Sequence, residues 1–150
     1  MKKQVSINDV APLIENVVSR DGKFRLYPKG ISMRPLLREG KDSVLLEKCT
    51  NIEKNDILLY KRPSGQYVLH RTVSVENSLV FCGDNQSFYE YGITENDIIA
   101  KVCGIYRKEK FYDLKKYNFK LYLFFIKFRR KVKNKVKRII KRFLKGKKKA

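Results

Sequence analysis

The sequence predicts a mainly β protein, in which a coiled antiparallel sheet or small barrel is preceded by one helix and followed by a basic amphipathic helix. Short segments of strand-like sequence recur between residues 23 and 106, separated by turn residues such as Pro63-Ser64-Gly65. Helical periodicity occurs only towards the two ends. The 150 residues suit one domain with an appendage, and 43% hydrophobic residues are enough for a core.

The first helix is expected over residues 7–20. Ser6 or Asn8 is a suitable cap, and Asp21-Gly22 would end the helix. Apolar residues recur at helical spacing between these limits, namely Val10, Leu13, Ile14, Val17 and Val18. This face predicts a helix that packs on the sheet.

Strands are expected wherever apolar and polar residues alternate, or β-branched residues cluster, between turn signals. They cover residues 23–27, 42–47, 56–60, 66–75, 79–82 and 97–106. Because no helical segment lies between them, an antiparallel arrangement is favoured over a parallel one.

The charge is concentrated at the C-terminus. The net charge is +20, but residues 111–150 carry 17 Lys and Arg and a single acid, Asp113. Residues 1–110 carry 18 basic and 14 acidic residues, which is an ordinary balance for a globular domain. We therefore expect a β domain with its N-terminal helix over residues 1–110, and a basic helical tail over residues 111–150.

Seven apolar residues of the tail, here named the apolar stripe, are spaced so that they share one face of a helix over residues 117–144. They are Leu121, Phe125, Phe128, Val132, Val136, Ile139 and Phe143. Basic residues surround the stripe, and Lys147 to Lys149 extend the charge. This pattern favours attachment to an anionic membrane surface. Docking of the stripe on the body or on a partner is the alternative. Nucleic-acid binding is disfavoured, because the aromatic residues lie on the stripe and form no stacking platform.

The cysteines and the distribution of apolar residues narrow the class of protein further. Cys49, Cys82 and Cys103 are widely spaced and predict reduced, buried thiols in a cytosolic protein, with no metal site and no cofactor. The N-terminus lacks the pattern of a secretory signal, and the longest apolar run has six residues, far below the ~20 that span a bilayer. We expect a cytoplasmic protein held peripherally at the inner face of the membrane.

Three stretches carry residues suited to nucleophilic catalysis. Ser32 lies in a turn after Gly30 and before Pro35, His70 is the only histidine, and Asp84 follows a glycine at a strand end. A serine hydroxyl needs a base to accept its proton as it attacks a carbonyl, and a neutral imidazole has the appropriate pKa. Taken individually, each residue also has an ordinary structural interpretation, as a turn former or a hydrogen-bonded strand residue.

The same stretches, in this order, resemble the type I signal peptidase family, which shares its fold with self-cleaving repressor proteases. Gly30-Ile31-Ser32-Met33-Arg34-Pro35 resembles the nucleophile box, and Leu69-His70-Arg71-Thr72-Val73 resembles the base box of the endoplasmic-reticulum branch, in which histidine replaces lysine. Asn55-Asp56-Ile57-Leu58 and Gly83-Asp84-Asn85-Gln86 resemble two further boxes, with Asn55 in place of a glycine. The resemblance covers about residues 23–107.

The resemblance implies a serine peptidase in which Ser32 is the nucleophile and His70 the base. The acid that orients His70 stays open: Asp84 is the first choice, and Glu90 is the second, at the position of an aspartate in that branch. Asp97 is a third choice. The backbone N–H of Ser32 would bind the oxyanion. Arg71 is expected to be a solvated or ion-paired neighbour of the histidine.

The implied substrate is an extended peptide with small residues before the scissile bond, such as the leader or signal-like segment of a precursor. Met33 and Pro35, on either side of Arg34, are expected to contact it. Self-cleavage is also open. Two alternatives remain: a non-catalytic peptide-binding or regulatory protein of the same fold, and a basic nucleic-acid-binding protein, although no helix-turn-helix pattern precedes the strands.

Overall fold

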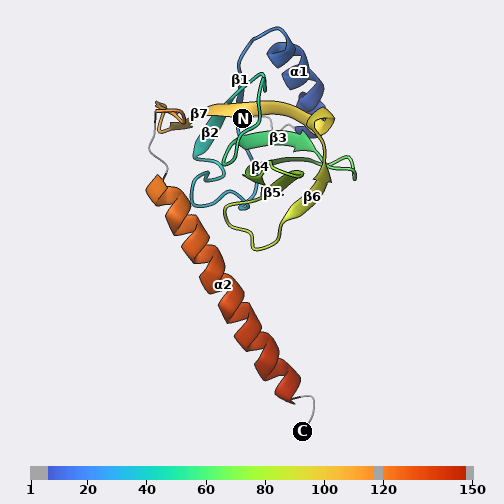
Figure 1. The fold of residues 1–150 in the computed structure, drawn as a ribbon. Helices are drawn as coiled ribbons and strands as arrows, with labels where there is room; N and C mark the ends of the chain where they lie inside the picture. The colour runs from blue at the N-terminus through green and yellow to red at the C-terminus, as the bar shows by residue number, and fades with distance from the viewer. Residues whose placement is uncertain (1–6, 117–119, 148–150) are drawn as a thin grey trace.

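The structure is a computed structural model that describes residues 7–116 and 120–147, without the side chains of residues 120, 121, 143 and 145–147. Its elements are α1 (Ile7–Ser19), β1 (Phe24–Leu26), β2 (Asp42–Glu47), β3 (Ile57–Lys61), β4 (Tyr67–Ser74), β5 (Leu79–Cys82), β6 (Glu90–Ile93), a 3₁₀ turn η1 (Glu95–Asp97), β7 (Ile98–Arg107), β8 (Lys110–Asp113) and α2 (Lys120–Lys147). The body is thus mainly β with a helix at each end (Figure 1).

The strands form one open antiparallel sheet of eight, in the order β1-β2-β7-β3-β4-β5-β6, with β8 paired to the C-terminal part of β7. β7 is the longest strand and pairs with β2, β3 and β8, so it links the two halves of the sheet. Register shifts in the pairs β2–β7, β3–β7 and β4–β5 bend the sheet.

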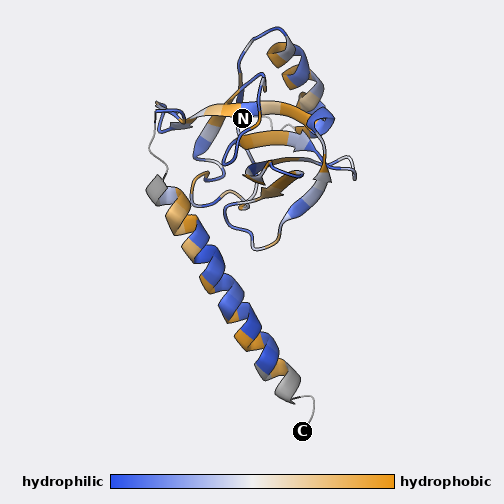
Figure 2. Ribbon diagram, in the orientation of Figure 1, coloured by the Kyte–Doolittle hydropathy of each residue, from blue (hydrophilic) through white to orange (hydrophobic). Residues whose placement is uncertain are grey.

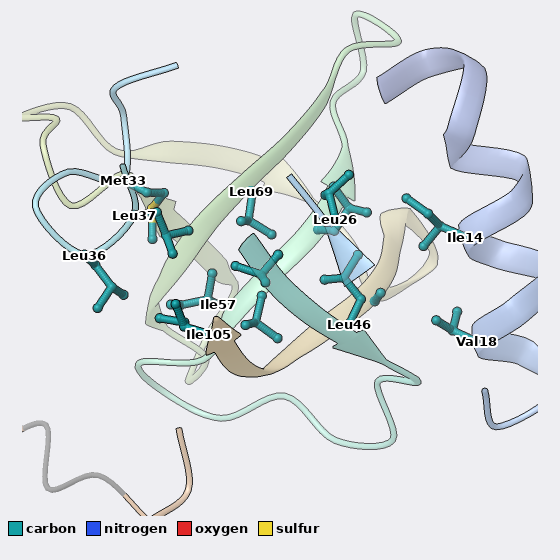
Figure 3. Packing of buried hydrophobic residues seen from close by; sticks show 14 residues of the cluster. Ile14, Val18, Leu26, Met33, Leu36, Leu37, Leu46, Ile57, Leu69 and Ile105 are labelled. Atoms are coloured by element: carbon teal, nitrogen blue, oxygen red, sulfur yellow. The ribbon is translucent and has the colours of Figure 1, made fainter. Parts of the chain in front are cut away.

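Apolar side chains cover both faces of β3. Ile57 and Leu59 belong to the larger core cluster, whereas Leu58 and Tyr60 belong to a smaller one. Since successive side chains of a strand point to opposite faces, the two clusters lie on opposite sides of the sheet. The larger cluster is closed by Ile14 and Val18 of α1 (Figure 3).

The positions of the predicted helices and strands are confirmed to within a few residues at each end. β6 and β8 were not predicted. The sequence of β6 contains Gly92, and β8 follows a two-residue turn in which Lys108 and Glu109 adopt positive φ. β8 also moves the boundary of the body, because residues 111–113 pair with β7 and do not begin the tail.

α2 extends from the body as one long helix, with apolar and basic residues alternating along it (Figures 1 and 2). No helix in the described part of the chain is long and apolar enough to cross a membrane. Near its start, Ile126 is buried, and Tyr122 packs against the larger core cluster.

A buried carboxylate anchors the segment that follows the predicted nucleophile. Asp42, whose side chain is fully buried, accepts hydrogen bonds from the guanidinium groups of Arg38 and Arg107, and Arg107 also donates to the carbonyl of Leu36. Burial by itself would raise the pKa of Asp42, but the hydrogen bonds from the two arginines outweigh it and hold the pKa well below its usual range. The turn after Ser32 is thereby tied to β2 and β7.

We expect Asp42→Asn to lower the free energy of unfolding at pH 7 by about 2 kcal/mol, because charge-assisted hydrogen bonds to both arginines weaken. The folded pKa lies below the unfolded value of about 3.9, so the carboxylate stabilises fully above that pH and progressively less as the pH falls. Urea unfolding of both proteins from pH 7 to pH 3 measures this. A difference between them that stays constant over the range would contradict the assignment.

Candidate functional site

Ser32 lies in a short turn between β1 and β2. Gly30 adopts φ +89°, in the left-handed region that glycine favours, and Met33 is buried in the larger core cluster. Ser32 itself is partly exposed. The buried methionine thus anchors the turn, while the neighbouring hydroxyl stays accessible.

The 83–87 loop, which follows β5, holds this turn from the other side. The N–H of Asn85 donates to the carbonyl of Ser32 over 2.7 Å, and its side-chain Nδ2 donates to the carbonyl of Ile31 over 3.1 Å. A Cβ on Gly83 would lie 2.7 Å from the Ser32 carbonyl oxygen, so only glycine permits this approach. Two stretches about fifty residues apart are therefore joined at the predicted nucleophile.

His70 lies in the middle of β4 and is 2% exposed. Its Nδ1 lies 2.9 Å from Oε1 of Glu90, a residue of β6. Because a carboxylate can only accept, the ring proton belongs on Nδ1, and Nε2 then carries the free lone pair. This is the tautomer that a general base requires.

Glu90 is fixed by three residues. Its Oε1 accepts from His70 and from one Arg62 NH2 group, while its Oε2 accepts from Arg62 Nε over 2.8 Å and from the Tyr60 hydroxyl over 3.0 Å. The bidentate guanidinium and the phenol hold this side chain, one methylene longer than aspartate, against the imidazole. Neither Arg62 nor Tyr60 was predicted as a site residue: Arg62 lies in the turn after β3, and Tyr60 was expected only as an apolar strand residue.

Asp84, the first choice as orienting acid, lies elsewhere. Its two carboxylate oxygens accept from Nε and NH2 of Arg71, each over 2.8 Å, and Oδ2 also accepts from the Tyr122 hydroxyl over 2.9 Å. The reason is the alternation of β4, which directs His70 and Arg71 to opposite faces. Asp97, the third choice, is partly exposed, and its carboxylate accepts hydrogen bonds from the backbone N–H and the hydroxyl of Thr94.

Arg71 was expected to be either solvated or ion-paired. It is 6% exposed and forms an ion pair with Asp84. Besides Asp84 it donates to the backbone carbonyl of Asn55 over 2.9 Å. Asn55 has φ +78°, a conformation that asparagine tolerates better than most residues, which accounts for its presence at a position where glycine would be unstrained.

Ser32 and His70 line the same cavity, of about 530 Å³. Met33 contributes to its wall, whereas Pro35 is exposed and is not among the lining residues, so only the first of the two expected substrate contacts borders the cavity. Apolar residues also line the cavity, including Val10, Leu26, Leu37 and Leu69. In the described chain no hydrogen bond joins Ser32 Oγ to the histidine.

The protonation states follow from burial and from neighbouring charges. Burial lowers the pKa of His70, and the Glu90 carboxylate only partly opposes this. For Glu90, hydrogen bonds from Arg62 and the proximity of His70 outweigh the effect of burial and lower its pKa. The site near pH 7 therefore combines a neutral imidazole with an ionised carboxylate.

The three cysteines are free thiols, and among the residues with described positions no three His, Cys, Asp or Glu side chains gather in a way that would hold a metal ion. Burial raises the pKa of Cys82 and raises that of Cys103 to about 11. Both thiols are thus kept in the unreactive protonated form.

The expected membrane-binding residues lie on α2. Phe125, Phe128 and Val132 are 48%, 58% and 45% exposed, so this part of the stripe is not packed on the body. The side chains of Leu121 and Lys147 lie outside the described residues. The face beside the stripe contacts the body instead, through Ile126 and basic side chains.

No protein-family model and no curated protein matches this sequence. The interpretation of the site therefore depends on its own geometry.

The single histidine makes the electrostatics directly measurable by NMR. We expect the pKa of His70, followed through the Hε1 chemical shift, to lie below 6.5, and to fall further in Glu90→Gln because a favourable negative charge is removed. Glu95→Gln, an exposed carboxylate in η1, is the matched control. An unchanged or raised His70 pKa in Glu90→Gln would contradict the contact.

Proposed function

We propose that the protein is a serine endopeptidase resembling signal peptidase, with Ser32 as nucleophile, His70 as general base and Glu90 as the acid that orients it. One observation carries the proposal: Ser32 and His70 line one cavity, while the Glu90 carboxylate occupies Nδ1 and leaves the Nε2 lone pair free.

The reaction follows from these positions. Nε2 accepts the proton of Ser32 Oγ as the oxygen bonds to the carbonyl carbon of the substrate. The imidazolium that forms is stabilised by Glu90 and returns its proton to the leaving amine when the C–N bond breaks. Water, activated by the same nitrogen, then hydrolyses the ester. Nucleophile–base hydrogen bonds are often long without substrate, which is consistent with their absence here.

The mode of substrate binding is inferred from the free edge of β4. β5 pairs with β4 only from Arg71 to Ser74, so Tyr67, Val68 and Leu69 have no strand on that side among the described residues. These residues also line the cavity. An extended peptide can therefore add along this edge and present its carbonyl to Ser32. The substrate class is the leader or signal-like segment of a peptide precursor.

Attachment to a membrane at its cytoplasmic face completes the proposal. The exposed stripe on α2 and the basic residues around it suit an anionic lipid surface, since apolar burial and attraction to lipid charge act together. No stripe residue with a described side chain is buried in the body.

A second candidate is a non-catalytic peptide-binding protein. It is favoured by the missing Ser32–His70 hydrogen bond and by Gly30, which offers no hydroxyl to an oxyanion. Such a protein would use the same cavity and the same edge of β4 without cleavage.

The test of catalysis is peptide cleavage. We expect the protein to cleave members of a synthetic peptide library with central alanine or glycine residues, and Ser32→Ala or His70→Ala to reduce the rate at least about a thousandfold. Ser64→Ala, in the exposed hairpin turn, should cleave at the normal rate. Mass spectrometry of the products gives rate and site. Cleavage that persists in Ser32→Ala excludes the mechanism, and peptide binding without cleavage supports the second candidate.

The test of attachment is sedimentation with vesicles. We expect binding to phosphatidylcholine vesicles that contain phosphatidylglycerol, and at least about tenfold weaker binding by the double variant Phe128→Ser, Val132→Ser, because two apolar side chains no longer insert. Leu13→Ser removes an exposed apolar residue of α1 as a control. Equal binding by all three proteins would exclude the stripe as the contact.

A further inference from the structure

Basic side chains of α2 contact the 83–87 loop. Lys133 Nζ donates to the backbone carbonyl of Asn85 over 3.0 Å and to its Oδ1 over 2.7 Å, and Arg129 NH2 lies 3.3 Å from the same Oδ1. Arg130 and Lys137 make single contacts with Gly83 and Ser87 on either side. The centre of these contacts is one residue, Asn85.

Asn85 uses its opposite side to hold the turn that carries Ser32. Its backbone N–H and its Nδ2 donate to the carbonyls of Ser32 and Ile31, while its backbone carbonyl and Oδ1 face the cations of α2. An amide can both donate and accept, which aspartate cannot do when ionised. Asn85 is thus a link between the tail helix and the predicted nucleophile.

We propose that α2 is a functional part of the site: Lys133, assisted by Arg129, is a positioning residue that fixes Asn85 and through it the Ser32 backbone. The effect on rate rests on the proposed peptidase function, whereas the effect on the loop does not. A displacement of about 1 Å at a nucleophile is enough to slow catalysis strongly.

The contacts of Lys133 and Arg129 with Asn85, here named the clamp, are geometrically compatible with lipid binding by the stripe. Phe128 and Val132 of the stripe each precede by one residue a side chain that contacts Asn85, namely Arg129 and Lys133. One residue corresponds to about 100° around a helix. The stripe therefore faces sideways from the body, and α2 can rest on a membrane while it holds the loop.

The experiment compares full-length variants without vesicles. We expect Lys133→Gln to raise the rate at which the backbone amide hydrogen of Asn85 exchanges with solvent, measured by NMR, about tenfold. We also expect it to lower kcat about tenfold with KM changed less than about twofold, because the loop is held less firmly. Lys133→Arg should retain most of both properties. Lys131→Gln removes the same charge from an exposed position on α2 and should resemble the unmodified protein.

Asn85→Asp provides a second route, because it keeps the contact with Lys133 but loses the Nδ2 donor to the Ile31 carbonyl. It should reproduce the fall in kcat. Normal exchange of the Asn85 amide in Lys133→Gln would overturn the clamp, whether or not the protein cleaves peptides. Faster exchange with an unchanged kcat would overturn the positioning role.

Discussion

The buried ion pair between Arg71 and Asp84 joins the parts of this protein that the candidate site requires. The guanidinium of β4 binds both carboxylate oxygens and also reaches the loop before β3 through the Asn55 carbonyl. Asp84 in turn accepts from Tyr122 of α2. Removing one partner of such a pair leaves an uncompensated charge and costs roughly 3–5 kcal/mol. The pair thus ties a central strand, the 83–87 loop and the tail helix into one unit.

Of the three acids predicted as partners of His70, the first two, Asp84 and Glu90, lie on opposite faces of β4. His70 and Arg71 are consecutive, so their side chains leave the strand in opposite directions, and each meets one carboxylate. Glu90 reaches the imidazole from β6, held by Arg62 and Tyr60. Asp84 neutralises the arginine. Glu90 therefore interacts electrostatically with the predicted base, whereas Asp84 stabilises the fold.

The tail helix α2 has two adjacent faces with different contacts. One face carries the exposed stripe, and the adjacent face carries cations that bind the backbone of the 83–87 loop. A helix whose only role was to bind lipid would need the stripe and a general positive charge. Directed contacts to Asn85 are an additional feature, and they place α2 within the same network as Ser32. The body and the tail are therefore joined by a network of directed contacts.

Most of the fold was predictable from local sequence, because alternation, turn residues and helical spacing act over a few residues. This applies to α1, to β2 and β5 at their full length, and to the long α2. The predicted nucleophile and base were recognisable for the same reason, since Ser32 and His70 lie in compact motifs. β6 and β8 were not predicted, because their own residue patterns do not indicate strands. They are strands through their pairing with β5 and β7.

The sequence by itself determined the class of fold, the segregation of charge and the two residues at the centre of the proposed reaction. Only the tertiary structure decided which acid faces His70, that Arg62 and Tyr60 hold it, and that Lys133 reaches Asn85. These contacts join residues 20 to 48 positions apart. They depend on strand register and on the packing of α2, which are set by the burial of the whole core and have no local signature.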